Sequence, residues 1–349
     1  MKTFMRLFKW NFFSLMCGFF PYSAYAVGAQ IETPKVCLIL DKAGKDDHGF
    51  NSLAVQAFDK ARRSSQIDSA SRIFEAKEDA QVAYAIRAFA ASGCQGIIAI
   101  GINTAEGVKE MAPRFPRQNF TLIDAVVSAP NVRSIVFRED EGSFLMGTIA
   151  AMKSPTKTVG FIGGMDIPLI QKFESAYKAG VRYINPSMSI LSAYVGVTVD
   201  AWNNPSKAQE IATSQFQRGA GIIFQASGGS GFGVFDAVEK RNTGSRDNPK
   251  AFVIGVDANQ NWIKPGLILT SMIKDIDRAV ADTIQLIHSG GFQGGIVTYG
   301  LENGGIDWAL DKYNSHLFTK DEVKKIQAII VSISRGQIKV SATTKAQEK

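Results

Sequence analysis

The chain has 349 residues, which is too long for one typical hydrophobic core and suits two domains. Its hydrophobic content of 45% and charged content of 20% exclude a disordered or collagen-like chain. Its formal net charge of +7 comes from scattered lysines and arginines, and the lack of a long basic run argues against a nucleic-acid partner.

Residues 1–26 have the pattern of a secretory signal peptide. A basic start is followed by the apolar run WNFFSLMCGFF and by SAYA, which predicts cleavage after Ala26. The apolar run is shorter than the roughly 20 residues of a membrane-spanning helix. Met16 stands before Cys17, where a lipid-attachment site usually has a small residue, so we expect no lipid anchor there. The mature protein is therefore predicted to be periplasmic or secreted.

Two cysteines remain after the leader, Cys37 and Cys94. Export permits a disulfide between them. We favour the alternative of two small buried thiols near strand starts, because free cysteine is often buried. The chain has only three histidines and no Cys/His cluster, so we predict neither a metal site nor a cofactor.

Short apolar runs alternate with amphipathic segments along the rest of the chain. Because most of the apolar runs are almost uniformly hydrophobic, they predict parallel strands buried on both faces and connected by helices. Two such series fit the length, one from about 35 to 124 and one from about 157 to 257. The expected strands are KVCLIL, SRIFEA, GIIAI, FTLID, SIVF, TVGFIGG, SILSAYVG, GIIFQAS, AFVIGVD, LILTSMI and GGIVTYGL. Near the end, TKDEVKKIQAIIVSISRG predicts a helix capped by Thr319, and residues 341–349 are expected to be a flexible tail.

Polar residues follow the predicted strands at their carboxyl ends, where doubly wound sheets bind ligands. The first strand runs into DKAGKDDHGFN, and three others end at Asp124, Asp257 and Lys274. Each aspartate alone is most often a helix cap or a turn former. Together they predict a pocket for a small polar ligand.

Catalytic alternatives find little support in the sequence. The loop GGSGFG, residues 228–233, matches neither the phosphate-binding loop nor the dinucleotide fingerprint, and no G-x-S-x-G elbow is present. Asp46 and Asp47 could act as a pair of catalytic acid and base groups, but they are adjacent in a loop, where neighbouring side chains usually point apart. His48 is expected to be a solvent-facing turn residue. We therefore predict a protein that is not an enzyme.

Several motifs resemble the basic membrane protein family of substrate-binding proteins for ABC importers, many of which receive purine nucleosides. The motifs are GKDDHGFN, FREDEGSFLMGTIAAM, VGFIGGMDIPLIQKFESAYKAGVRYINP, SGGSGFGVFDA, VIGVDANQ, LTSMIKDIDRAV and YGLENGGI. The resemblance implies an α/β type I periplasmic binding fold, with two doubly wound parallel-sheet lobes joined by a hinge of three crossovers. The boundaries it implies are 31–133 plus 271–292 for the first lobe and 134–270 plus 293–340 for the second.

The resemblance also implies a ligand site. Phe50 would stack on a base and Asn51 would hydrogen-bond its ring, whereas ordinary core packing is the alternative for Phe50. The chain departs from the family pattern at Gly49, where serine is usual, and in SGGSGFG, which adds Phe232 as a second candidate ring-facing aromatic. The full set of implied binding residues is Asp47, Phe50, Asn51, Asp124, Phe173, Gly229, Phe232, Asp257 and Lys274.

These observations favour a monomeric receptor that captures a nucleoside, with purines first, and delivers it to an ABC permease in the inner membrane. One alternative is a ligand-sensing receptor of the same fold, and another is the same fold binding a different small polar ligand. A secreted nucleoside hydrolase would need a metal or base cluster that the sequence does not show.

Overall fold

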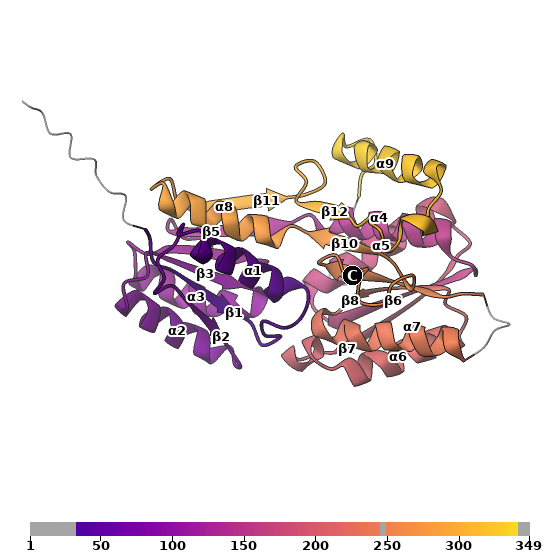
Figure 1. Cartoon of the computed structure of the whole chain (residues 1–349), viewed down its shortest axis with the longest axis horizontal. Helices are drawn as coiled ribbons and strands as arrows, with labels where there is room; N and C mark the ends of the chain where they lie inside the picture. Colours follow the sequence, from indigo (N-terminus) through magenta and orange to yellow (C-terminus); the bar gives the residue numbers. More distant parts are fainter. Residues whose placement is uncertain (1–32, 245–248, 341–349) are drawn as a thin grey trace, which may run out of the picture. The chain divides into compact units, whose positions relative to one another are not determined.

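The computed structural model describes residues 33–244 and 249–340, and these residues belong to one compact unit. The expected signal peptide, Cys17 and the expected tail at 341–349 lie outside the described residues. Two six-stranded sheets with helices packed against them make up two lobes (Figure 1).

The sheet of the first lobe is entirely parallel, in the order β11-β5-β4-β3-β1-β2. Its strands are β1 (Val36–Leu40), β2 (Arg72–Glu75), β3 (Gly96–Ile100), β4 (Asn119–Ile123), β5 (Val132–Phe137) and β11 (Gly295–Tyr299). Its helices are α1 (Phe50–Arg63), α2 (Ala80–Ala91), α3 (Ala105–Met111) and α8 (Ile276–His288).

Strand β1 shows why these segments read as continuous apolar runs. Val36, Leu38 and Leu40 belong to one hydrophobic cluster with α1 and α8, whereas Cys37 and Ile39 belong to another with α2 and α3. Successive side chains of a strand point to opposite faces, so a strand covered on both sides needs apolar residues at every position.

The sheet of the second lobe has the order β12-β10-β9-β8-β6-β7. Its strands are β6 (Thr158–Met165), β7 (Ser189–Gly196), β8 (Ile222–Ala226), β9 (Phe252–Asp257), β10 (Ile268–Lys274) and β12 (Ile306–Trp308). Its helices are α4 (Glu139–Lys153), α5 (Pro168–Ile184), α6 (Pro205–Gln217), α7 (Gly231–Thr243) and α9 (Lys320–Ser334). The edge strand β12 is antiparallel to β10, so this sheet departs from the all-parallel expectation. Thr319 caps α9, as predicted, in a reciprocal capping box with Glu322.

Strand pairing moves the expected lobe boundaries. Strand β5 extends the first lobe to Phe137 rather than to residue 133. Residues 271–274, expected in the first lobe, belong to β10, which pairs with β9 of the second sheet. Strand β11, expected in the second lobe, pairs with β5 of the first. The crossovers therefore follow β5, β10 and β11, and α8 packs beside α1 (Figure 1).

Cys37 and Cys94 form a disulfide, so the expectation of two free thiols was wrong. Cys37 faces the α2 side of the first sheet, and Cys94 lies just after α2 where the chain enters the neighbouring strand β3. Their Cα atoms are 6.0 Å apart, within the range that a disulfide bridges. The bond joins two residues 57 positions apart and fastens the end of α2 to the sheet.

Candidate functional site

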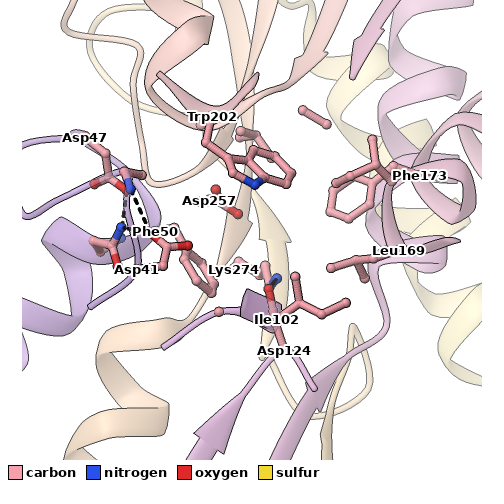
Figure 2. A pocket seen from close by; sticks show the side chains of 17 residues that line it. Asp41, Asp47, Phe50, Ile102, Asp124, Leu169, Phe173, Trp202, Asp257 and Lys274 are labelled. Atoms are coloured by element: carbon pink, nitrogen blue, oxygen red, sulfur yellow. Dashed lines mark hydrogen bonds and ion pairs between the residues drawn. The ribbon is translucent and has the colours of Figure 1, made fainter. Parts of the chain in front are cut away.

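One cavity lies at the carboxyl ends of strands from both sheets (Figure 2). Its volume is about 610 Å³ when the part open to solvent is included. The lining residues are Asp41, Ala43, Asp47, Phe50, Asn51, Gly101, Ile102, Asp124, Leu169, Ile170, Phe173, Trp202, Ala226, Gly228, Val256, Asp257 and Lys274.

Two aspartates, one from each lobe, follow the same design. Asp124 comes directly after β4, and Asp257 is the last residue of β9. Both adopt left-handed backbone conformations, with φ of +70° and +65° respectively. Such a conformation is uncommon for residues other than glycine and is most readily adopted by Asn and Asp. It ends each strand abruptly and leaves a short acidic side chain at the cavity.

Lys274 is the last residue of β10. It lies close to these two aspartates and is almost fully buried. Its Nζ forms ion pairs with Asp124 and, at 3.4 Å, with Glu139. The same ammonium lies 5.0 Å from the ring centroid of Phe50 and 4.9 Å from that of Phe137. We call Asp124, Glu139, Asp257 and Lys274 the floor of the cavity.

Burial governs the protonation of the floor. It raises the pKa of Asp257 to about 7, although nearby Lys274 opposes the rise. It raises the pKa of Asp124 to about 6 against the same opposing charge. For Lys274, burial alone would lower the pKa, but Asp124, Glu139 and Asp257 together raise it. The lysine is therefore a fixed positive charge, while the two aspartates titrate near neutral pH.

The loop between β1 and α1 supplies the opposite wall. The carboxylate of Asp47 accepts hydrogen bonds from the backbone N–H groups of Gly49 (3.0 Å), Asn51 (2.8 Å) and Ser52 (2.9 Å). These are donors at the start of α1 that have no partner within the helix, so Asp47 caps it. The capping fixes the direction in which Phe50 and Asn51 enter the cavity.

The side chain of Asn51 is held by Asp41, the first residue after β1. Asn51 Nδ2 donates to Asp41 Oδ1 at 2.7 Å. Burial raises the pKa of Asp41 to about 6, and the Asn51 hydrogen bond opposes that rise. Within the described residues, Asn51 Oδ1 and Asp124 Oδ1 are buried and have no hydrogen-bond partner. The cavity thus presents buried acceptors that call for donors, since an unpaired buried polar atom is costly.

Aromatic and apolar side chains complete the cavity. In Figure 2, Asp41 and Asp47 lie on one side, and Leu169 and Phe173 of α5 lie on the other. Trp202 projects from the 3₁₀ helix Val199–Trp202, which follows β7. The combination of flat aromatic faces with acidic acceptors suits a ring compound that carries hydroxyl or N–H donors.

Seven of the nine residues expected in the site line the cavity, and Gly229 and Phe232 do not. Gly228 lines the cavity instead of Gly229. A Cβ added to Gly229 would point to the backbone of Trp202. Phe232 is the second residue of α7 and stands against the ring of His48 instead. Trp202 and Asp41 also line the cavity and were not among the predicted residues, although Asp41 directly follows β1 and Trp202 lies in the segment after β7, where the strand-end rule applies.

Two α/β lobes joined by three crossovers, with a cavity at the facing strand ends, define a type I periplasmic-binding-like fold. The structure is similar to a solute-binding protein of an ABC transporter system from Aeropyrum pernix, with a TM-score of 0.79, 25% identity, and coverage of 89% of this chain and 94% of the other.

The sequence profile of the family described as ABC transporter substrate-binding protein PnrA-like matches residues 35–343, so the chain belongs to that family. The chain is 28% identical to the ABC transporter nucleoside-binding protein BmpA of Lactococcus lactis, over 91% of this chain and 93% of the relative. It is 31% identical to the CD4+ T-cell-stimulating antigen of Listeria monocytogenes, over 87% of each. No helix within residues 33–244 and 249–340 has the length and apolar character to cross a membrane.

Proposed function

We propose that the protein captures a nucleoside, with purines preferred, and delivers it to an ABC permease as a periplasmic or secreted monomer without catalytic activity. The observation that carries the proposal is that Asp124 and Asp257, one from each lobe, line a single cavity together with Phe50 and Trp202. The family of the chain and the printed name of its Lactococcus lactis relative support it.

The donor and acceptor balance of the cavity favours a ligand with several hydroxyl or N–H groups. Asn51 Oδ1 and Asp124 Oδ1 need donors, and Asp257 adds a carboxylate. Ribose hydroxyls and a ring N–H supply such donors, and hydrogen bonds to ionised acceptors are among the stronger ones. We assign the ribose to the floor and the base to Asn51 and the aromatic side chains.

The charge balance argues against a phosphorylated ligand. The lining contains four aspartates and a single cation, Lys274, which already pairs with Asp124. A phosphate would enter a buried site of its own sign, where Coulomb repulsion is weakly screened. A nucleoside is therefore expected to bind and the matching nucleotide to be rejected.

Phe50 is assigned to stack on the base. Its ring already contacts the Lys274 ammonium, so it stands at the junction of the polar floor and the apolar walls. Base–aromatic stacking is worth about 1–3 kcal/mol by alanine substitution, which is roughly 5- to 150-fold in affinity. Loss of that contact is the most specific signature of a ring ligand.

The test is a calorimetric titration of the mature protein with inosine, inosine monophosphate, hypoxanthine and ribose. We expect inosine to bind most tightly and the monophosphate to bind at least about 100-fold more weakly. Phe50→Ala is expected to weaken inosine binding by roughly 5- to 150-fold. Phe115→Ala, which changes a partly buried phenylalanine of the first lobe away from the cavity, is the matched control. Equal binding of inosine and its monophosphate, or an unchanged affinity in Phe50→Ala, would contradict the proposal.

A further inference from the structure

A second set of contacts joins the two lobes at the mouth of the cavity, outside the lining. His48, in the loop between β1 and α1 of the first lobe, reaches α7 and the β9–β10 connection of the second. Its ring centroid lies 5.4 Å from that of Phe232 and 5.8 Å from that of Trp262, both in edge-to-face geometry. The backbone of the same residue accepts a hydrogen bond from Gln260 Nε2 at 3.3 Å. We call His48, Phe232, Gln260 and Trp262 the rim latch.

The backbone of the first lobe is shaped for this contact. His48 has φ of +46°, in the left-handed region that few residues other than glycine adopt. The next residue, Gly49, lies so close to the second lobe that a Cβ there would stand 3.8 Å from Asp257 Cβ and from Gln260 Nε2. The turn therefore brings both the ring and the carbonyl of His48 against the second lobe.

The second lobe holds its half of the rim latch rigidly. Gln260 is buried, and its Oε1 accepts hydrogen bonds from the backbone N–H of Val256 (3.0 Å) and from Gln225 Nε2 (3.1 Å). Its backbone N–H donates to Ser271 Oγ at 3.0 Å. These three hydrogen bonds hold Gln260 in place, so that its Nε2 points to the backbone carbonyl of His48. Val256 also lines the cavity, so its hydrogen bond to Gln260 connects the rim latch to the ligand site.

The charges near the rim latch contribute little to it. Lys42 and Asp200 form an ion pair between the lobes at 2.5 Å, but their side chains are 39% and 71% exposed. Ion pairs in such surroundings are largely screened by water and salt. At the rim, the specific interlobe contacts are therefore the aromatic group and the Gln260 hydrogen bond, and they add to the ion pair of Lys274 with Asp124 in the floor.

We propose that the rim latch is a closure device that stabilises the closed arrangement of the two lobes without touching the ligand. Contacts made only in the closed form shift the open–closed equilibrium whether or not ligand is present. They slow ligand release, because the lobes must separate before the ligand leaves. Phe232, which is absent from the cavity lining, acquires a role in this device.

The test separates the ring of His48 from its backbone conformation. His48→Asn removes the ring but keeps a residue type that tolerates a left-handed backbone. Trp262→Ala removes one partner ring, and the double variant shows whether the two act together. His316→Asn, which changes an exposed histidine of the second lobe outside the rim latch, is the matched control.

Lobe closure is read from the distance between spin labels on Arg87→Cys in α2 and Ser206→Cys in α6, two exposed positions. In the ligand-free protein, we expect His48→Asn and Trp262→Ala each to raise the ratio of open to closed molecules by about threefold to tenfold. The double variant should match His48→Asn, because loss of the His48 ring already removes its contacts with both Phe232 and Trp262, whereas Trp262→Ala leaves the contact with Phe232. Distance distributions that match those of the unmutated protein and of His316→Asn would overturn the proposal.

A second arm uses inosine and rests on the proposed function. Dissociation of inosine, followed by stopped flow, is expected to be about threefold to tenfold faster in His48→Asn than in His316→Asn. If inosine does not bind at all, the proposed function fails, while the ligand-free distances still decide the rim latch. If inosine binds and both arms show no effect of His48→Asn, the rim latch alone is wrong.

Discussion

The floor and the rim latch of the cavity join the same two lobes by different chemistry. The floor is buried and ionic, with Lys274 between Asp124 and Glu139 at less than a tenth exposure for each side chain. The rim latch is aromatic and partly exposed, and half of the Trp262 side chain faces solvent. Removing one partner of a buried ion pair strongly destabilises a protein, whereas contacts between partly exposed rings are weaker and can form and break. From this difference we infer that the floor governs which ligand binds and how tightly, and that the rim latch governs how readily the lobes separate.

The largest expected effect is the loss of the floor cation. Lys274→Met would leave the acids of the floor without their positive partner, and removing one member of a buried ion pair typically costs about 3–5 kcal/mol of unfolding free energy. Urea unfolding of the ligand-free protein measures this loss. Lys42→Met is the rim counterpart, because its ion pair with Asp200 is exposed, and it is expected to cost less than about 1 kcal/mol. Similar losses in the two variants would break the comparison.

The next effect separates global stability from the cavity. Removing the Cys37–Cys94 disulfide by the double change to alanine is expected to lower the unfolding free energy by about 2–4 kcal/mol, because a 57-residue separation closes a long loop. Neither cysteine lines the cavity, so inosine affinity measured below the unfolding transition should stay within about twofold. A large loss of affinity together with little loss of stability would show that the disulfide shapes the site itself.

The smallest effect is a pH dependence that belongs to the floor. Burial gives Asp257 a pKa of about 7, so the ligand-free protein holds a proton there that the unfolded chain has already released. Its contribution to stability is therefore present below about pH 4 and is lost as pH rises toward 7. Ligand donors favour the charged carboxylate, so binding releases that proton and strengthens as pH rises.

Calorimetric titration with inosine from pH 5.5 to 7.5 measures this dependence. For one carboxyl with a pKa of about 7, linkage predicts an affinity gain on the order of 20-fold over that range. Asp257→Asn should remove most of this gain and leave the smaller one of Asp124, whose pKa is about 6, and Asp200→Asn should leave the profile unchanged. A flat profile in the unmutated protein would contradict the assignment of ligand donors to Asp257.

The sequence predicts the site better on one side than on the other, for a physical reason. Asp124, Asp257 and Lys274 end largely apolar strands, and a parallel sheet gathers such ends at one edge, so the convergence of Asp257 and Lys274 follows from periodicity. Asp124 ends a strand of the other sheet, and its place beside them follows from the facing lobes that the family resemblance implies. Phe232 is the second residue of α7, so the direction of its side chain depends on where that helix begins. Its ring contacts His48 of the rim latch and does not line the cavity.

Other features depend on tertiary pairing that local patterns do not encode. The apolar run of β10 is compatible with either sheet, and only its pairing with β9 decides between them. Two cysteines 57 residues apart give no signal of how close their Cα atoms lie. Family resemblance supplied the two-lobed fold, and the strand pairing supplied its actual boundaries.

The central claim is that acidic acceptors from both lobes hold the ribose of a nucleoside. Its most direct test is the ratio of the dissociation constants of 2′,3′-dideoxyinosine and inosine for the mature protein at pH 7.5. Because each hydrogen bond to a charged group is worth about 1.5–3 kcal/mol, we predict that the dideoxy compound binds at least about 100-fold more weakly. Equal affinities would contradict the assignment of the ribose to Asp124 and Asp257.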